Sequence, residues 1–345
     1  MRAFLNFLIG VLGVFMTSVC TAELILLASP SSADPYYNKA HDDIVNFQIN
    51  YARKIIENGD NVLVLSTKAL CRKYVKALGN DSVAIAPMLD IWMRDFTLTN
   101  PENPIMFRYT AAGQGSGKKG QNQADQVQYI FFQLIEKAGL SFKKSDLLND
   151  GGNYVDDYAG NVVISHKFLQ DNHISQAQGR EKLSALTAAK NVAFIEADEQ
   201  GGLEHADGVV SFVGTNKLMM NSYPKNLKYS DQLKKDLKRQ LPGVKIYEIT
   251  TPYNDSQIYD KRFGSACGLY TNMLVTKERI YLPQFGIPQD KLALKQVQAV
   301  TSLKVVPVLS SEVCYMGGGV RCMSLQIRGE NARKLLKYAE NYRCS

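Results

Sequence analysis

Short apolar runs and amphipathic segments alternate along the 345 residues of this chain. Runs rich in β-branched residues predict buried strands, and apolar residues spaced three or four apart predict helices. The predicted strands cover residues 22–28, 61–67, 82–87, 161–165, 191–196, 206–214, 217–223, 244–250, 273–283 and 304–310. The predicted helices cover residues 36–60, 122–139, 175–190, 229–241, 290–300 and 331–342. This alternation is typical of an α/β fold.

The most irregular stretch is YTAAGQGSGKKGQNQADQ, residues 109–126, for which we expect a long glycine-rich loop. It is not a phosphate-binding P-loop, because that signature needs glycine where Ala112 stands and Ser or Thr where Lys119 stands. The chain has no proline-rich or serine-rich linker, and no repeat is visible as residue identity. We therefore expect a single domain after the N-terminal segment.

The N-terminal segment MRAFLNFLIGVLGVFMTSVCTA has one positive charge at Arg2, then an apolar run, then small residues. This layout predicts a secretory signal peptide at residues 1–22, with cleavage after Ala22 or Cys20. A membrane anchor and a lipid-modified Cys20 are the alternatives, but the apolar run is short and lacks a basic stop-transfer cluster. We expect a secreted or periplasmic protein with one domain at residues 23–345 and no stable membrane insertion after signal cleavage.

Composition and charge exclude some functions. With 45% hydrophobic and 21% charged residues, the chain has the composition of a folded globular protein. Removing Arg2, the only charged residue of the signal peptide, lowers the net charge from +7 to +6. The excess lies in segments such as KNLKYSDQLKKDLKRQ, where it most simply forms a solvated helix face. Because a dense basic stripe with aromatic partners is missing, we expect no nucleic-acid partner.

Six cysteines become five if Cys20 is removed, so an exported protein would keep at least one unpaired thiol. The chain has no CxxC motif and no Cys/His spacing of a zinc site, so we predict no metal. Cys314 could pair with Cys267 in an oxidising compartment, although connectivity cannot be deduced from sequence.

Four polar stretches interrupt apolar runs, as site residues of α/β proteins often do. They are DIWMRD at residues 90–95, DGGN at 150–153, HAD at 205–207 and CYMGGGVRC at 314–322. His205 and Asp207 are two apart in a segment that continues as an extended run, so both side chains are expected on one face of a strand. The three glycines before Cys322 favour a sharp bend or a close approach of the backbone. Each stretch alone is also compatible with an ordinary turn or a structural ion pair.

The four stretches in this order resemble the guanidino-group-modifying superfamily, and most closely the bacterial-type peptidylarginine deiminase and agmatine deiminase family. A further match is LYTNMLVTKERIYLPQFG, which adds Asn272 to the set. The resemblance runs from about residue 24 to the end of the chain and implies a five-bladed, pseudo-symmetric α/β propeller of the pentein type. It also implies that residues 23–345 form a single deiminase catalytic domain that needs no cofactor.

The resemblance implies a role for each matched residue. Cys322 would be the nucleophile, His205 the general acid and base, and Asp95 and Asp207 the carboxylates that grip a guanidinium. The implied substrate-binding residues are Trp92, Arg94, Asn153 and Asn272. These residue types suit the chemistry, because carboxylates hold a planar cation by charge-assisted hydrogen bonds and a thiolate is the effective nucleophile. Arg321 or the substrate cation itself could favour the thiolate.

The substrate stays open between agmatine, free arginine and an arginine-containing peptide. Arg321 stands where many agmatine deiminases have His, and Asp150 stands where the family often has Glu. The expected partner is thus a small cationic guanidino compound or an arginine-containing peptide. Three alternatives remain: a Cys–His–Asp amide hydrolase, an amidinotransferase of the same superfamily, and an exported protein that binds a guanidinium without catalysis.

Overall fold

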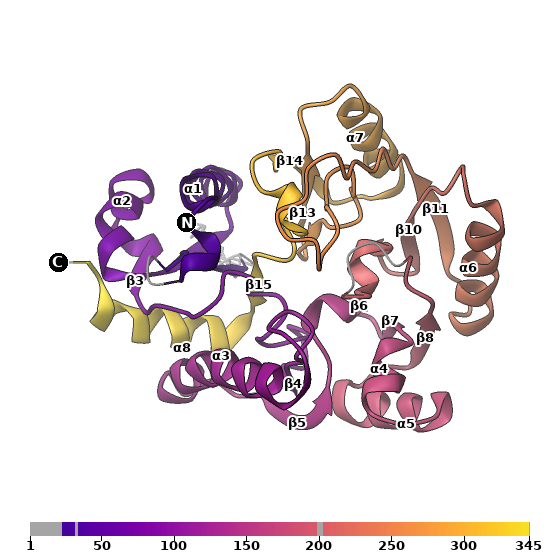
Figure 1. Ribbon diagram of the computed structural model, residues 1–345, viewed down its shortest axis with the longest axis horizontal. Coiled ribbons are helices and arrows are strands. Elements are labelled where there is room, and N and C mark those ends of the chain that lie inside the picture. Colours follow the sequence, from indigo (N-terminus) through magenta and orange to yellow (C-terminus); the bar gives the residue numbers. More distant parts are fainter. Residues whose placement is uncertain (1–22, 32–33, 199–202, 345) are drawn as a thin grey trace, which may run out of the picture.

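The computed structural model describes residues 23–31, 34–198 and 203–344, which form fifteen strands and eight α-helices in a mixed α/β fold. The α/β prediction is confirmed. The strands of the described residues form five separate sheets, and no closed sheet joins them there. Figure 1 shows the sheets around a central region with most of the helices towards the outside. The expected signal peptide lies outside the described residues.

The first sheet has the order β15-β1-β2-β3 and joins the two ends of the described chain. Its strands are β1 Leu24–Ala28, β2 Asn61–Ser66, β3 Val83–Ile85 and β15 Leu325–Ile327. The last strand pairs antiparallel with β1, whereas β1, β2 and β3 are mutually parallel. Helix α1, His41–Glu57, connects β1 to β2, and α2, Lys68–Leu78, connects β2 to β3. All five residues of β1 are buried, as a strand covered on both faces requires.

The other four sheets repeat one local pattern, in which a parallel strand pair is connected through a helix. The paired strands are β4 Ile105–Arg108 with β5 Lys143–Leu148, β7 Asn161–Ser165 with β8 Asn191–Ile195, β10 Lys217–Asn221 with β11 Lys245–Ile249, and β13 Arg279–Gln284 with β14 Lys304–Leu309. Three of these pairs carry an antiparallel strand on the other edge: β6 Val155–Asp156, β9 Val210–Gly214 and β12 Leu274–Val275. The repeat is therefore one of topology rather than of residue identity.

The remaining helices connect these parallel strands or follow β15. They are α3 Gly117–Lys137, α4 Lys167–Asp171, α5 Gln176–Thr187, α6 Leu227–Gln240, α7 Gln289–Val300 and α8 Gly329–Ala339. Six 3₁₀ turns punctuate the loops: η1 Pro35–Tyr37, η2 Asn80–Ser82, η3 Gly151–Asn153, η4 Ala206–Gly208, η5 Cys314–Met316 and η6 Glu340–Tyr342. Within the described residues, no helix has both the length and the apolar character needed to cross a membrane.

The structure corrects three expectations about local structure. The prediction of a long loop over residues 109–126 is wrong, because α3 begins at Gly117. The amphipathic pattern of residues 122–139 therefore belongs to a helix that starts five residues earlier than predicted. The strand through His205 and Asp207 is wrong, because Ala206–Gly208 form a 3₁₀ turn and the strand starts only at Val210. The sequence pattern also missed α2, α4, β4, β6 and β5. The last of these has no fully buried residue, so it lacks the apolar signal of a central strand.

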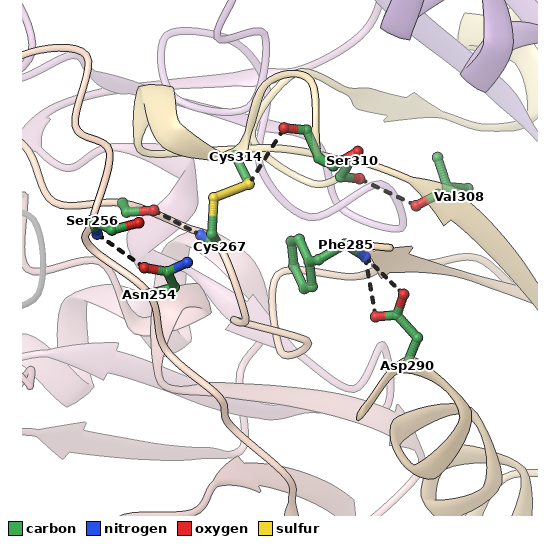
Figure 2. Close-up of a disulfide and its surroundings, with 10 residues drawn as sticks. Asn254, Ser256, Cys267, Phe285, Asp290, Val308, Ser310 and Cys314 are labelled. Atoms are coloured by element: carbon green, nitrogen blue, oxygen red, sulfur yellow. Dashed lines mark hydrogen bonds between the residues drawn. A yellow bond between two sulfur atoms is a disulfide. The ribbon is translucent and has the colours of Figure 1, made fainter. Parts of the chain in front are cut away.

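Two disulfides close long loops of the chain. Cys267 pairs with Cys314, as considered from the sequence, and Cys71 pairs with Cys344. Figure 2 shows the first of these beside Ser310 and Asn254. The backbone of Ala266 also donates to the carbonyl of Cys314, so the segment ahead of β12 is tied to the turn that precedes the glycine-rich stretch. Cys322 is the free cysteine of the described residues.

Candidate active site

A cavity of about 320 Å³ opens between loops that follow or precede strands of different sheets. The sequence-predicted residues on its wall are Trp92, Asp95, His205, Asp207, Asn272 and Cys322. The structure thus brings together side chains from three of the four motifs and from the stretch around Asn272, and Asp150 of the remaining motif lies on the same wall. Among the described residues, no group of three or more His, Cys, Asp and Glu is arranged to hold a metal ion.

Cys322 follows the glycine-rich stretch, and two of the three glycines have a physical reason to be there. Gly317 has φ of 93°, in the left-handed region that favours glycine. A Cβ on Gly318 would lie 2.4 Å from the ring of Trp92 and 3.0 Å from the Cβ of Cys322. A Cβ on Gly319 would meet only ordinary contacts with Ser310. The backbone therefore bends at Gly317 and passes closely over Trp92 at Gly318, which places the thiol at the cavity.

The thiol of Cys322 is buried beside carboxylates. Burial, with the nearby charges of Asp207 and Asp95, raises its pKa well above the ordinary value. The side-chain amide of Asn272 donates to the sulfur at 3.1 Å, which opposes part of this increase. These groups favour the thiol over the thiolate, so a cation next to the sulfur is needed to favour the thiolate.

His205 lies between two carboxylates. Its Nε2 is 3.0 Å from Asp150 Oδ2, and its Nδ1 is 3.7 Å from Asp95 Oδ1. Burial lowers the pKa of the imidazole, but Asp95 and the hydrogen bond to Asp150 outweigh it and raise the value to about 9. Burial raises the pKa of Asp95 to about 7, although the charge of His205 acts in the opposite direction. His205 is thus held as the imidazolium near neutral pH, ready to donate a proton.

Asp150 of the DGGN motif has no role assigned from the sequence. In the structure, Asp150 is the hydrogen-bond partner of His205. It precedes η3 and accepts from the backbone of Thr110 at 2.9 Å and from the Thr110 hydroxyl at 3.0 Å. A carboxylate fixed in this way sets the orientation of the imidazole. The sequence signal for this role is an acidic residue directly before Gly-Gly, because glycines allow another side chain to approach the backbone closely.

Gly152 shows how tightly this part of the site is packed. A Cβ at this position would lie 2.5 Å from His205 Nδ1 and 2.8 Å from Asp95 Oδ1. Its backbone N–H donates to Asp95 Oδ1 at 3.1 Å. Only glycine leaves room for the imidazole of His205 and the carboxylate of Asp95 to pack against the backbone at this position. Gly152 is therefore part of the site geometry.

Asp207 lines the cavity and is paired with a cation of the protein. Its Oδ2 accepts from Arg321 Nη1 at 2.5 Å, and Arg321 Nη2 donates to the carbonyl of Tyr154 at 2.7 Å. Burial lowers the pKa of Arg321, but Asp207 outweighs it and raises the value. The guanidinium of Arg321 is thus hydrogen-bonded to Asp207. The structure assigns it the role of holding this carboxylate, in place of the expected role of favouring the Cys322 thiolate.

Two predicted substrate-binding residues do not reach the cavity wall. The guanidinium of Arg94 donates to Gln326 Oε1 at 3.3 Å, and burial lowers its pKa to about 10, with Arg321 adding to the effect. The side chain of Asn153 accepts from the backbones of Ser165 and Ala206. Both residues are buried and support the loops that carry the site, so a direct substrate contact is not supported for either.

Comparisons with known proteins agree with this architecture. The chain is 26% identical over 220 residues to a Lactococcus lactis protein that is provisionally named agmatine deiminase. The aligned region covers 54% of this chain and 58% of that protein. A Streptococcus mutans protein with the same provisional name is 24% identical over 289 residues, covering 73% of this chain and 78% of that protein. The chain spans less than two thirds of the length of the first of these relatives.

Solved structures show the same fold, and a family model covers most of the chain. The C. jejuni agmatine deiminase structure superposes with a TM-score of 0.74 at 19% identity, covering 90% of this chain and 94% of that one. The model of the Porphyromonas-type peptidyl-arginine deiminases matches residues 18–327. A match of this extent carries the assignment, and the chain belongs to the Porphyromonas-type peptidyl-arginine deiminase family.

Proposed function

We propose that this protein is a guanidine deiminase, a hydrolase that converts a linear guanidinium into a ureido group and ammonia through a covalent intermediate on Cys322. One observation carries the proposal: a single cavity holds the free thiol of Cys322, the imidazole of His205 and, among its carboxylates, those of Asp95, Asp150 and Asp207. A planar cation can be gripped by two carboxylates while the thiol faces its carbon. An amide hydrolase of the Cys–His–Asp type would have no use for the second and third carboxylates.

In the first half of the reaction, Asp95 and Asp207 bind the N–H edges of the guanidinium. The bound cation offsets the charges that raise the pKa of Cys322, so the thiol releases its proton to solvent when substrate is present. The thiolate forms a bond to the central carbon. His205 then donates its proton to the departing nitrogen, the C–N bond breaks, and ammonia leaves a thiouronium-type intermediate.

In the second half, the neutral His205 accepts a proton from water, and the oxygen of that water bonds to the same carbon. The C–S bond then breaks, the hydroxyl oxygen becomes the ureido carbonyl, and its proton passes to the sulfur, so the ureido product leaves and the Cys322 thiol is restored. Asp150 fixes the imidazole throughout, and Asn272 donates to the sulfur each time it carries charge. Acid–base help of this kind contributes roughly 10²–10⁴-fold to a rate.

The substrate we favour is agmatine, a guanidinium with a second cation at its far end. Beyond the reacting groups, the cavity wall includes Asp34 and Asp90, so its acidic residues outnumber its basic ones. Asp90 is buried and accepts from Tyr37 at 2.5 Å and Gln114 at 2.8 Å, an arrangement that fixes its carboxyl group in the cavity wall. The provisional names of the relatives support the same choice.

A protein-arginine deiminase is the second candidate, and Arg262 favours it. This residue lines the same cavity, is half exposed and is paired with Asp260 at 2.6 Å. A guanidinium at this place could exchange Asp260 for the carboxylate of an arginine-terminated peptide. Replacing Arg262 with Gln would weaken peptide turnover and leave agmatine turnover unchanged if the second candidate is correct.

The test uses the protein from Glu23 onward beside Cys322→Ala, with agmatine, free arginine and an arginine-terminated peptide. Ureido product and ammonia are measured together, and quenched samples are examined by mass spectrometry for an adduct equal to substrate less ammonia. We expect product in a one-to-one ratio with ammonia, and no product from Cys322→Ala. Silence on all three substrates from a folded protein would overturn the proposal and favour a binding protein. Guanidine consumption that needs an added amine and releases no ammonia would favour an amidinotransferase.

We further propose that the five sheets are the blades of a pseudo-symmetric propeller and that the protein is exported. The repeated parallel pair with its connecting helix supports the first proposal. Two disulfides support the second, because such bonds persist in oxidising compartments and are rare in the cytosol.

A further inference from the structure

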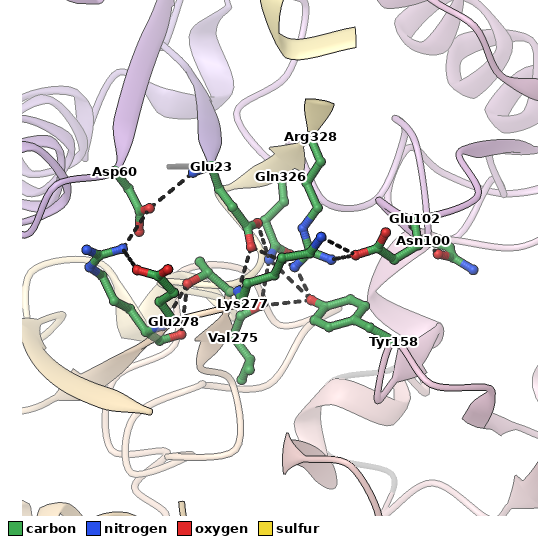
Figure 3. Close-up of polar contacts among 12 residues, drawn as sticks. Glu23, Asp60, Asn100, Glu102, Tyr158, Val275, Lys277, Glu278, Gln326 and Arg328 are labelled. Atoms are coloured by element: carbon green, nitrogen blue, oxygen red, sulfur yellow. Dashed lines mark hydrogen bonds and ion pairs between the residues drawn. The ribbon is translucent and has the colours of Figure 1, made fainter. Parts of the chain in front are cut away.

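Glu23 is the first described residue, and its contacts are those of a residue built into the core. Its carboxylate accepts from Arg328 Nη2 and from the backbone N–H of Lys277, each at 2.6 Å, and from Gln326 at 3.2 Å. Its carbonyl accepts from the backbone of Asn61 at 2.8 Å. Figure 3 shows these partners around the carboxylate. The start of β1 is therefore held at one position.

The backbone nitrogen of Glu23 has a partner of its own, which is a carboxylate. It donates to Asp60 Oδ1 at 3.1 Å. The side chain of Asp60 is 1% exposed and also accepts from Arg279 Nη1 at 3.1 Å and from the hydroxyl of Tyr281 at 2.7 Å. A buried carboxylate placed against a backbone nitrogen would form a much stronger bond if that nitrogen were an ammonium.

We propose that signal cleavage between Ala22 and Glu23 creates an α-ammonium group that forms a buried ion pair with Asp60, so that removal of the leader completes the fold. Cleavage after Cys20, or lipid attachment at Cys20, would leave a neutral amide at Glu23 and forgo this pair. The structure thus favours one of the two cleavage positions that the sequence leaves open. The cleaving enzyme would be a signal peptidase that accepts small residues before the bond.

The surrounding charges allow an added cation at this point. Arg279, on β13, faces Asp60 and also approaches Glu278 at 3.4 Å, so part of its charge is directed to a second acid. On the other side, Arg328 is shared between Glu23 and Glu102, each at 2.6 Å. The α-ammonium would thus lie between the carboxylate of Asp60 and that of its own residue. Such a pair stabilises the protein at a pH below the titration of the amine and loses its effect above it.

The first experiment asks where the exported protein begins. The full chain is expressed with its leader in a bacterial host, and the protein recovered outside the cytoplasm is examined by intact mass and N-terminal sequencing. We expect a chain that starts at Glu23. A mature chain that starts at Thr21, or one that carries lipid on Cys20, would overturn the proposal.

The second experiment tests the ion pair itself with no change to the core. Proteins starting at Glu23, Ala22 and Thr21 are released from a cleavable fusion that leaves no extra residue. We expect the Glu23 form to melt at least ~2 °C higher than the other two at pH 7, because only it has an ammonium at Asp60. We also expect its α-amine to react at least tenfold more slowly with an amine-selective acylating reagent. Equal melting and equal labelling would overturn the proposal.

Asp60→Asn completes a cycle of variants. Because the asparagine side chain carries no charge, the difference in melting temperature between the Glu23 and Ala22 forms should disappear in this background. A difference that persists would show that the charge of Asp60 is not the cause and would overturn the ion pair. If Asp60→Asn does not fold, the labelling rates of the unsubstituted forms decide the question.

Discussion

Two buried polar clusters of this protein contrast in how their charges are satisfied. The reactive cluster consists of Asp95, Asp150, His205, Asp207 and Cys322, and the Glu23 cluster consists of Glu23, Asp60, Arg279, Gln326 and Arg328. In the Glu23 cluster each carboxylate accepts from an arginine and from further donors. Burial raises the pKa of Glu23 despite these partners; in the reactive cluster it raises the pKa of Asp95 to about 7 and the pKa of Cys322 well above its ordinary value. The carboxylates of the Glu23 cluster are paired with arginines of the protein, whereas the carboxylates around Cys322 can also bind a cationic substrate.

This difference separates structural from functional use of the same residue types. Buried charges that are paired and hydrogen-bonded contribute to a defined fold, and removing one partner leaves a costly unpaired charge. Carboxylates that crowd a thiol in a cavity are unfavourable until a positive group arrives, which is how perturbed pKa values mark a site. The comparison predicts opposite responses to substitution in the two clusters.

In the reactive cluster, Gly152→Ala is expected to reduce activity strongly. The new Cβ would lie within 3 Å of both His205 Nδ1 and Asp95 Oδ1, so the imidazole must move. Because a displacement of about 1 Å in a site can cost ~10²-fold, we expect kcat/KM to fall by at least that factor. Gly319→Ala is the matched control, since its Cβ has room, and it should retain activity within about threefold. Full activity in Gly152→Ala would contradict the assigned geometry.

In the Glu23 cluster, Arg328→Met should destabilise the fold without changing the chemistry. The substitution removes the partner of Glu23 and a guanidinium that lies 4.3 Å above the ring of Tyr158. Breaking a buried pair in this way costs roughly 3–5 kcal/mol, measured as the free energy of unfolding in urea. The activity of the molecules that remain folded should be unchanged. A loss of kcat at unchanged stability would contradict the structural assignment of this cluster.

Asp95→Asn should remove activity and stabilise the fold, the opposite of the Arg328 variant. Burial raises the pKa of Asp95 to about 7, whereas an unfolded Asp titrates near 3.9, so ionisation destabilises the folded state as pH rises between these values. The variant should therefore equal the natural protein below about pH 4 and exceed it by about 1–3 kcal/mol above pH 7. Unfolding curves at pH 4, 6 and 8 measure this. Lower stability of the variant at pH 8 would contradict the assignment.

The pH dependence of activity sharpens the description of the reactive cluster. The free enzyme needs Asp95 ionised and His205 protonated, and their pKa values of about 7 and about 9 predict a bell-shaped profile of kcat/KM. Because the Cys322 thiol also releases a proton on the way to the intermediate, the maximum should lie on the alkaline side of pH 8, and kcat/KM should fall by at least about tenfold for each pH unit well below 7. Because Asp95 and His205 interact, the two apparent pKa values of the profile belong to the pair and not to either residue alone. A profile that stays flat from pH 5 to 8 would rule out Asp95 as the group that titrates.

The smallest effect is expected at an ion pair outside both clusters. Glu330 and Arg333 lie one helical turn apart on α8 and are largely exposed. Glu330→Gln should change the free energy of unfolding by less than about 0.5 kcal/mol, because exposed pairs are screened by water and salt. Urea unfolding beside Arg328→Met provides the comparison, and a change as large as that variant's would show that burial is not what distinguishes the pairs.

Local patterning accounts for what the sequence alone determined. Buried strands such as β1 and β7 follow from continuous apolar runs, and helices such as α6 follow from a 3.6-residue period, since both depend on neighbouring residues only. The order of the motifs predicted Cys322, His205, Asp95, Asp207 and Trp92 in one site. The failures lie where local signals are weak, as in β5 with its partly exposed residues.

Tertiary packing decided the contacts between distant segments, because they depend on how the five sheets meet and not on any local pattern. Asp150 meets His205 across 55 positions, and Arg321 meets Asp207 across 114. Arg94 and Asn153 carry motif positions, yet packing directs their side chains to supporting contacts. The placement of Asp60 against the nitrogen of Glu23 likewise appears only when β1 and β2 lie side by side. The sequence specified which ionisable side chains this protein has. The fold decided which of them are paired within the protein and which can bind a ligand.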